Sequence, residues 1–414
     1  MGTFNGFYKL SRQDKLSKLI NNQWINSKPN DLSENSLENM IENVIGSYKL
    51  PMGVAVNFII NHKDYVIPMV IEEASVVAAA SHAAKILGNI TSNTYEREII
   101  GQIIFSSMDL MSSARLSHWF NASKDRLLIL ARELSVNMVA RGGGPKDIVL
   151  KQFGEDNQID LCLYLTFDPC DAMGANSINT VLEGLGQMIT EATECKPLMT
   201  ILSNYQEHAL TKAQVRIPIR ELHSDSEQSY QLAHKIVQAS YYAQVDVYRA
   251  VTHNKGIMNG IDAVLMATAN DWRAVEAGIH AFASRNGRYQ GLSHWQIQGN
   301  ELVGSLEIPL AIATVGGSIS SHDTAQWSLE LLNYPNTKEL SEIICAVGLA
   351  QNFAALRALV SEGIQRGHMS MQARNIAISI GAKGDEIQKI TSRMIENKQV
   401  NREYALELLL NFKK

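Results

Sequence analysis

One lysine and three acidic residues of this chain are of types, and at spacings, that suit catalysis at a carbonyl group. Lys255 lies in a glycine-punctuated stretch, HNKGIMNG (253–260), and Asp271 follows sixteen residues later. A lysine held beside an aspartate can stabilise the negative charge that develops on a carbonyl oxygen. Glu72 and Glu73 stand between a predicted strand and an apolar helix, where one of them could be kept protonated and donate a proton. From pattern alone, a solvated surface role is favoured for the glutamate pair and for the lysine.

Two further segments carry groups suited to proton transfer and to phosphate binding. His368, in RGHM, stands at the start of a predicted helix, and histidine is the side chain that delivers protons near neutral pH. A histidine on a helical tail can also be merely solvated. The stretch DAMGAN (171–176) runs into a helix whose first amides could hold a phosphate, and Gly142–Gly144 is a second glycine loop. No GxGxxG follows a predicted strand, so the pattern does not favour a standard Rossmann domain.

The elements that position these residues change in character along the chain. The patterns predict helices at 11–21, 36–45 and 72–88, with two strands in 51–69. The stretch 98–203 has its own helices, including 123–138, and strands at 147–153, 159–167 and 197–203, which indicates a compact α+β insert. Beyond it the patterns predict strands at 209–219 and 301–312, a helix over 226–248, two helices up to about 360 and a wholly helical last fifty residues.

Composition excludes several classes of protein. Of 414 residues 45% are hydrophobic, and 37 basic against 42 acidic residues give a net charge of −5, which argues against a general nucleic-acid binder. No apolar run approaches the roughly 18 residues of a membrane span, so neither nucleic acid nor membrane is an expected partner. Four scattered cysteines and eleven histidines without ligand spacing predict free thiols and no metal site. A cytoplasmic location is expected.

Six segments together resemble one enzyme family. They are ENVIG (42–46), PMVIEEASVVAAAS (68–81), DAMGANSINT (171–180), THNKGIMNGIDAVLMATANDWRAVEAG (252–278), VGLAQNFAALRAL (347–359) and SEGIQRGHMSMQARNIA (361–377). In this order, over nearly the whole chain, they resemble the 3-hydroxy-3-methylglutaryl-CoA (HMG-CoA) reductases of the bacterial class II. That family reduces HMG-CoA to mevalonate and free CoA with two reduced nicotinamides.

The resemblance implies a role for each candidate catalytic residue. Lys255 matches the cation that stabilises the carbonyl oxygen, and Asp271 the aspartate that hydrogen-bonds to that lysine and to the glutamate. Glu73 matches the acid that protonates oxygen at the aldehyde stage. His368 matches the histidine that protonates the departing CoA thiolate, on a C-terminal helical flap that closes over the substrates.

The resemblance also implies binding residues. Arg249 matches the arginine that holds the terminal carboxylate of the substrate; Ser75, Asn259 and Gln351 match further contacts in that pocket, and Lys9 a contact to the CoA phosphates. Asp171, Met173, Gly174 and Asn176 resemble the dinucleotide-binding loop. Ser135 stands where NADH-preferring relatives carry an aspartate, and Arg132 lies three residues earlier, which favours NADPH over NADH.

The implied fold is α+β. A large mixed α/β substrate-binding and dimerisation domain (1–97 and 204–362) carries an inserted small α+β NAD(P)-binding domain (98–203) and a C-terminal helical flap (363–414). The family is homodimeric with shared active sites, which would place Glu73 opposite Lys255 and Asp271 of the partner. Three alternatives remain: the same enzyme oxidising mevalonate with NAD, a non-catalytic CoA- or nucleotide-binding protein, and an acyl-CoA transferase or thiolase. The last lacks a cysteine in a nucleophile setting.

Overall fold

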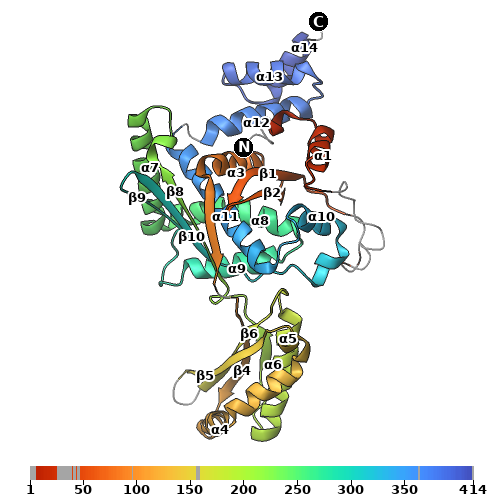
Figure 1. Cartoon of the computed structure of the whole chain (residues 1–414), viewed down its shortest axis with the longest axis vertical. Helices are drawn as coiled ribbons and strands as arrows, with labels where there is room; N and C mark the ends of the chain where they lie inside the picture. Colours follow the sequence, from red (N-terminus) through yellow and green to blue (C-terminus); the bar gives the residue numbers. More distant parts are fainter. Residues whose placement is uncertain are drawn as a thin grey trace.

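The chain forms three parts stacked along its long axis in a computed structural model (Figure 1). An inserted unit (residues 99–202) lies below a central unit, and the C-terminal helices lie above it. The structure describes residues 6–25, 40, 43, 47–95, 97–154, 159–361 and 364–412, with the backbone alone at 8, 12–13 and 364–371.

The central unit is built on a six-stranded mixed sheet in the order β2-β1-β3-β8-β10-β9. Every neighbouring pair is antiparallel except β1 and β3. Along β8 the odd residues from Thr211 to Ile217 are buried and the even ones exposed, so the sheet has a core face and a polar face. The strands are β1 (Met52–Ile60), β2 (Lys63–Val70), β3 (Asn89–Thr94), β8 (Leu210–Pro218), β9 (Ser293–Gln298) and β10 (Glu301–Pro309).

Helices cover the core face of this sheet and complete the main hydrophobic core. They are α3 (Val76–Leu87), α7 (Ser226–Val245), α8 (Val247–Ala267), α9 (Trp272–Ala283), α10 (Asp323–Leu331) and α11 (Thr337–Val360), with short turns η2 (Ile219–Glu221) and η3 (Gly317–Ser321). At the N-terminus η1 (Phe7–Lys9) and α1 (Arg12–Asn21) form a satellite core with β1, β2 and α10.

Helix α11 is the spine of the central unit. This helix is long and apolar enough to span a membrane. The sequence did not suggest this, because its uninterrupted apolar runs are much shorter than a membrane span. Two thirds of its most apolar window is buried inside the protein, as expected of a core helix. The 24 residues give a rod about 36 Å long that runs from the junction with the inserted unit toward the C-terminal helices.

The inserted unit has a separate core between a four-stranded antiparallel sheet and two helices. Its sheet order is β5-β6-β4-β7, and both chain crossings to the central unit lie at one end (Figure 1). The elements are β4 (Ile99–Met108), α4 (Leu110–Leu134), α5 (Val136–Ala140), β5 (Gly144–Phe153), β6 (Ile159–Asp168), α6 (Ala175–Thr193) and β7 (Met199–Leu202).

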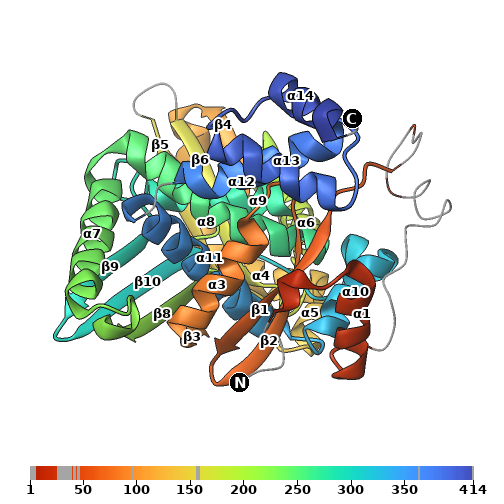
Figure 2. The same cartoon turned by 90° about the horizontal axis from the view of Figure 1, so that it is seen from above.

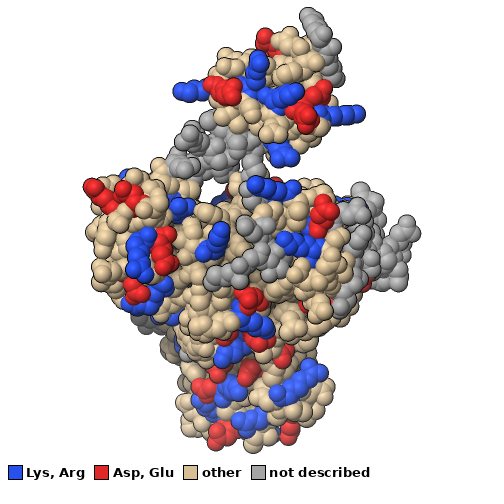
Figure 3. Space-filling model, turned by 45° about the horizontal axis from the view of Figure 1, so that its top comes forward, with Lys and Arg blue, Asp and Glu red and all other residues tan. Residues whose placement is uncertain are grey.

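The C-terminal helices form a third unit with its own small core. They are α12 (Ile364–Ser379), α13 (Asp385–Glu396) and α14 (Arg402–Phe412). Seen from above, they lie over the face of the central unit that carries α3 (Figure 2). Acidic and basic side chains alternate over this unit and the body below it (Figure 3), in keeping with the nearly balanced charge.

Most predicted elements are present, and the differences are informative. The hairpin of β1 and β2, the helix α3, the strands β5 to β8 and the helical C-terminus are confirmed. The helix predicted at 123–138 is wrong in extent, because α4 begins at Leu110. Strands β3, β4 and β9 were not predicted, and the helix expected at 36–45 lies outside the described residues apart from residues 40 and 43.

No helix was predicted for the glycine-punctuated segment at 253–260, but this segment is the middle of helix α8. A Cβ at Gly260 would lie 3.0 Å from the Cβ of Gln351, so this glycine allows α8 and α11 to pack closely. Tertiary packing between the two helices outweighs the low helix propensity of glycine.

Candidate functional site

An ion pair between Lys255 and Glu73 is the centre of the candidate site. The Nζ atom of Lys255, on α8, lies 2.6 Å from Oε2 of Glu73, in the turn before α3. The lysine side chain is 60% exposed and the glutamate 34% exposed, so the pair is open on one side. Both groups come from one chain, which corrects the expectation that Glu73 faces the lysine of a partner subunit.

The backbone around Glu73 is held in an unusual conformation. Ser75 begins helix α3 with φ +79° and ψ −24°, a left-handed conformation that costs a serine energy. Its hydroxyl does not cap the helix, although Ser75 is at the N-cap position. The hydroxyl of Ser75 therefore makes no hydrogen bond to the first turn of α3, and Ser75 is only two residues from Glu73 in the chain.

Helix α8 carries two further candidate residues, Asn259 and Arg249. Asn259 lies one turn after Lys255 on the same side of the helix. Arg249 lies in the first turn, where its backbone amide donates to Asp246 at 2.8 Å. Partial burial lowers the pKa of Arg249, and no described residue forms an ion pair with its guanidinium. A half-buried guanidinium without a counter-ion is suited to binding an anionic ligand.

Gln351 faces α8 from the middle of α11. It is 5% exposed, and its Oε1 atom is buried without a hydrogen-bond partner among the described residues. Buried polar atoms are normally paired, so an orphan acceptor at this position favours a donor supplied by a ligand or by water.

Asp271 is placed elsewhere in the same chain. It caps helix α9, where Oδ1 accepts from the amide of Ala274 at 3.1 Å, and Arg273 lies 3.9 Å away. Between Lys255 and the end of α8 the helix rises about 18 Å. The predicted pairing of Asp271 with Lys255 is therefore not made within one chain.

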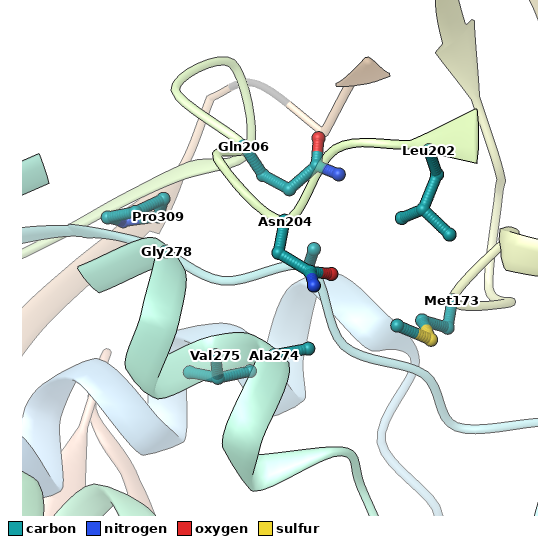
Figure 4. A pocket seen from close by; sticks show the side chains of 9 residues that line it. Met173, Leu202, Asn204, Gln206, Ala274, Val275, Gly278 and Pro309 are labelled. Carbon is teal, nitrogen blue, oxygen red and sulfur yellow. The ribbon is translucent and has the colours of Figure 1, made fainter. Parts of the chain in front are cut away.

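Helix α9 instead faces the inserted unit. Ala274 and Val275 of α9 line a small cavity of about 10 Å³ together with Met173 and Leu202 from that unit (Figure 4). This volume is about that needed for one water molecule. Asp271 thus begins the helix that the predicted dinucleotide-binding loop contacts.

The predicted dinucleotide-binding loop is brought together with the glycine triplet. Strands β5 and β6 are antiparallel with Gly144 opposite Asp168, so the start of one lies beside the end of the other. A Cβ at Gly143 would lie 2.5 Å from the carbonyl oxygen of Asp168, which shows how closely the two loops pack. Gly174, with φ +89°, precedes α6, whose first turn has no side-chain cap and includes the exposed Asn176. The free amides of this turn can hold a phosphate.

The two residues predicted to determine the preference for NADPH over NADH differ in solvent exposure. Arg132 is exposed on the last turn of α4. Ser135 is 7% exposed, and its hydroxyl donates to the carbonyl of Ala131 at 2.7 Å. Ser135 therefore lies beside the glycine triplet without presenting its hydroxyl to a ligand.

Two predicted site residues lie at the edges of the described structure. Lys9 is exposed at the end of η1, which packs near β1 and β2 through Phe7. His368 lies in the first half of α12, and its side chain is outside the described residues. Its proposed role is therefore based on sequence alone.

A buried polar network next to Lys255 was not predicted. His253 Nε2 lies 2.7 Å from the hydroxyl of Ser293 and 3.1 Å from the amide nitrogen of Asn352, whose oxygen accepts from the indole of Trp295 at 2.8 Å. Burial lowers the pKa of His253 to about 3, so the ring is uncharged. The network joins α8, β9 and α11 and fixes the orientation of α8. No single-residue signal marks it, because its partners are up to 99 residues apart.

Among the residues that the structure describes, no three His, Cys, Asp or Glu side chains are grouped in a way that could hold a metal ion. The four cysteines are free thiols. Cys170, at the dinucleotide-binding loop, is half-buried, and burial raises its pKa. A thiol in this state is a poor nucleophile, which disfavours thiolase-like chemistry.

Comparison with known proteins identifies the family. The family model for hydroxymethylglutaryl-coenzyme A reductase matches residues 9–373. The 3-hydroxy-3-methylglutaryl-coenzyme A reductase of Archaeoglobus fulgidus is 39% identical over 98% of this chain and 93% of its own length. A reductase structure from Streptococcus pneumoniae is 42% identical, with a TM-score of 0.83 over 99% of both chains. A class II structure from the same organism, described as bound to NADPH in open conformations, is 41% identical, with a TM-score of 0.81 over 98% of this chain and 100% of that chain. By the match of the family model and by these identities, the chain belongs to the hydroxymethylglutaryl-coenzyme A reductase family.

Proposed function

We propose that this protein reduces HMG-CoA to mevalonate and CoA with two NADPH, at sites that two subunits share. The observation that carries the proposal is the ion pair of Lys255 and Glu73, which is open to solvent; less than two turns earlier on α8, the guanidinium of Arg249 has no counter-ion among the described residues. Family membership supplies the reaction, and this geometry supplies groups suited to it.

Lys255 stabilises charge in each reduction. Hydride addition to a carbonyl carbon places negative charge on the oxygen, and an ammonium fixed nearby lowers the free energy of that state. Glu73, in contact with this ammonium at 2.6 Å, lies where a proton can pass to the oxygen. The first reduction gives a hemithioacetal, which breaks its C–S bond to release CoA and an aldehyde. The second reduction gives the alcohol.

His368 protonates the leaving group. A thiol with a pKa of about 8.5 leaves more readily when its sulfur receives a proton, and imidazolium can supply one near neutral pH. The position of His368 on α12, in a helical unit with a core of its own, fits a flap (363–414) that moves relative to the central unit.

Four residues bind the hydroxymethylglutaryl group in this proposal. Arg249 pairs with the terminal carboxylate, and the orphan Oε1 of Gln351 accepts a hydrogen bond from a substrate hydroxyl. Asn259 and Ser75 flank Lys255 and Glu73 and complete the pocket. Lys9 is the candidate for the CoA phosphates.

The inserted domain (98–203) binds NADPH in this proposal. Asp171, Met173, Gly174 and Asn176 form the loop that meets the dinucleotide, with the pyrophosphate at the start of α6. Arg132, exposed near the glycine triplet, is the candidate for the 2′-phosphate. Ser135 contributes by leaving no carboxylate there to repel that phosphate.

The two halves of the proposed site lie apart in one chain, which supports a homodimer. Lys255 and Glu73 form one half, and Asp271 with the dinucleotide-binding loop forms the other; the helix rises about 18 Å between Lys255 and the end of α8, shortly before Asp271. Exposed apolar side chains near the α7–α8 corner suit contact with a second copy. These include Tyr241, Tyr242, Val247, Tyr248 and Val251, of which Tyr248 is 88% exposed.

Substitution of Lys255 by alanine tests the chemical role. We expect turnover of HMG-CoA to fall by roughly 10²–10³-fold, as when another preorganised oxyanion partner is removed, with CoA ligands still bound. Near-normal turnover would remove the proposed role of Lys255. Mevalonate oxidation with NAD passes through the same transition states, and a cytoplasmic enzyme that prefers NADPH is expected to work in the reductive direction.

A further inference from the structure

The carboxylate of Asp171 joins the inserted unit to the central unit. Its Oδ1 atom accepts hydrogen bonds from the amide of Thr337 at 3.1 Å and from the hydroxyl of Thr337 at 2.9 Å. Thr337 is the first residue of α11 and is fully buried. The amide of Thr314 donates to the carbonyl of Asp171 at 3.1 Å. Arg97, in the crossing before β4, lies 4.0 Å from Oδ1.

This contact is charged and directional. The start of α11 carries the positive end of the helix dipole, which favours a carboxylate. Burial lowers the pKa of Arg97 while Asp171 opposes the shift, so the aspartate compensates part of the cost of burying the guanidinium. Met173 lines a small cavity together with Ala274 and Val275 (Figure 4), and apolar packing of this kind is not directional. The hydrogen bonds of Asp171 therefore set how the loop is oriented on the central unit.

The second carboxylate oxygen of Asp171, Oδ2, is not held in this way. No described residue hydrogen-bonds to Oδ2, and the side chain of Asp171 is 53% exposed. Gly174 and Asn176 follow closely in the chain. The hydrogen bonds that fix Asp171 therefore also restrict the position of the start of α6.

We propose that Thr337 is a positioning residue for dinucleotide binding: it holds one oxygen of Asp171 against α11 so that the other faces the ribose hydroxyls of the cofactor. This inference rests on the proposed function, since it assumes that the loop binds NADPH. Thr337 itself does not touch the cofactor in this arrangement.

Thr337→Val tests the proposal, because it removes the hydroxyl at nearly constant volume and retains the amide. Loss of one hydrogen bond to a charged group corresponds to about tenfold weaker binding, which we expect for NADPH titrated by its own fluorescence. The KM for HMG-CoA should not change. Thr337→Ser, which keeps the hydroxyl, should restore NADPH affinity to within about twofold.

Ser341→Ala is the matched control. Ser341 is also fully buried on α11, and its hydroxyl donates to the carbonyl of Thr337 at 2.9 Å without contacting Asp171. We expect this variant to bind NADPH normally, even if its Tm falls as far as that of Thr337→Val. Equal NADPH affinities in the two variants would overturn the proposal.

Arg97→Gln removes the positive charge beside Asp171. It provides a second test of the same contact if Thr337→Val does not fold. Severalfold weaker NADPH binding is expected, and unchanged binding would count against the proposal.

Direct titration of NADPH also tests this inference separately from the proposed reaction. A wild-type protein that binds NADPH but does not oxidise it with HMG-CoA would refute the reductase function and leave the role of Thr337 to its own test.

Discussion

A heterodimer built from two inactive variants tests the shared site. Lys255→Ala removes the cation from one half of the proposed site, and Asp271→Ala alters the other half. In a dimer with one subunit of each kind, one site would contain both substitutions, whereas the other would contain Lys255 and Glu73 of one chain and Asp271 of its partner. That second site is intact.

The expected magnitude follows from this count. Each homodimeric variant should keep roughly 0.1–1% of wild-type activity if the substitution costs about 10²–10³-fold, as expected for loss of the oxyanion partner. A heterodimer isolated with two different affinity tags should regain about half of the wild-type kcat, because one of its two symmetric sites is complete. The KM for HMG-CoA and for NADPH should be normal at that site.

The control uses the ion pair seen within one chain. A heterodimer of Lys255→Ala and Glu73→Ala subunits contains no intact site if both residues serve the same site from one chain, as their 2.6 Å contact indicates. It should remain inactive. Recovery in this control, or no recovery in the Lys255 and Asp271 heterodimer, would refute the proposed division of the site.

Three further predictions concern other residues. Asp262 lies in hydrogen-bonding reach of Glu276; burial, with the hydrogen bond and charge of that glutamate, raises the pKa of Asp262 from 3.8 to about 8. The folded protein therefore retains a proton that the unfolded chain loses above pH 4, so the free energy of unfolding falls as pH rises from about 4 toward 8. Asp262→Asn should remove this loss, so that its Tm relative to wild type rises between pH 5 and pH 8; a constant difference would refute the argument. His368→Gln should slow reduction of HMG-CoA but spare supplied mevaldehyde, which releases no thiolate, and equal losses would exclude this role. Arg132→Ala should raise the KM for NADPH more than that for NADH, and an unchanged ratio would place the 2′-phosphate elsewhere.

Local patterns predicted much of the fold, because they report contacts between near neighbours in sequence. The β1–β2 hairpin follows from alternation around a turn at Asn61, and the loop at 171–176 leads into α6 as its glycine suggests. Helix α8 was missed because of Gly256 and Gly260; at Gly260 the helix packs closely on α11, a tertiary contact that the local pattern does not report.

The candidate site was predictable in its residues but not in its geometry. Lys255 and Glu73 are 182 positions apart, and no pattern along the chain indicates that they meet in one subunit. The burial of Ser135 could not be predicted, because it depends on how α5 packs beside the glycine triplet. The contact of Asp171 with Thr337 joins two units of the protein and has no signature in either segment.

The most direct test of the proposed reaction is its stoichiometry in the wild-type protein. HMG-CoA is supplied as the limiting substrate with NADPH, and oxidised nicotinamide and released CoA thiol are measured in the same reaction. The proposal predicts two NADPH oxidised for each CoA released, with mevalonate as the product. Release of CoA without NADPH oxidation, or no reaction from a folded dimer, would contradict it.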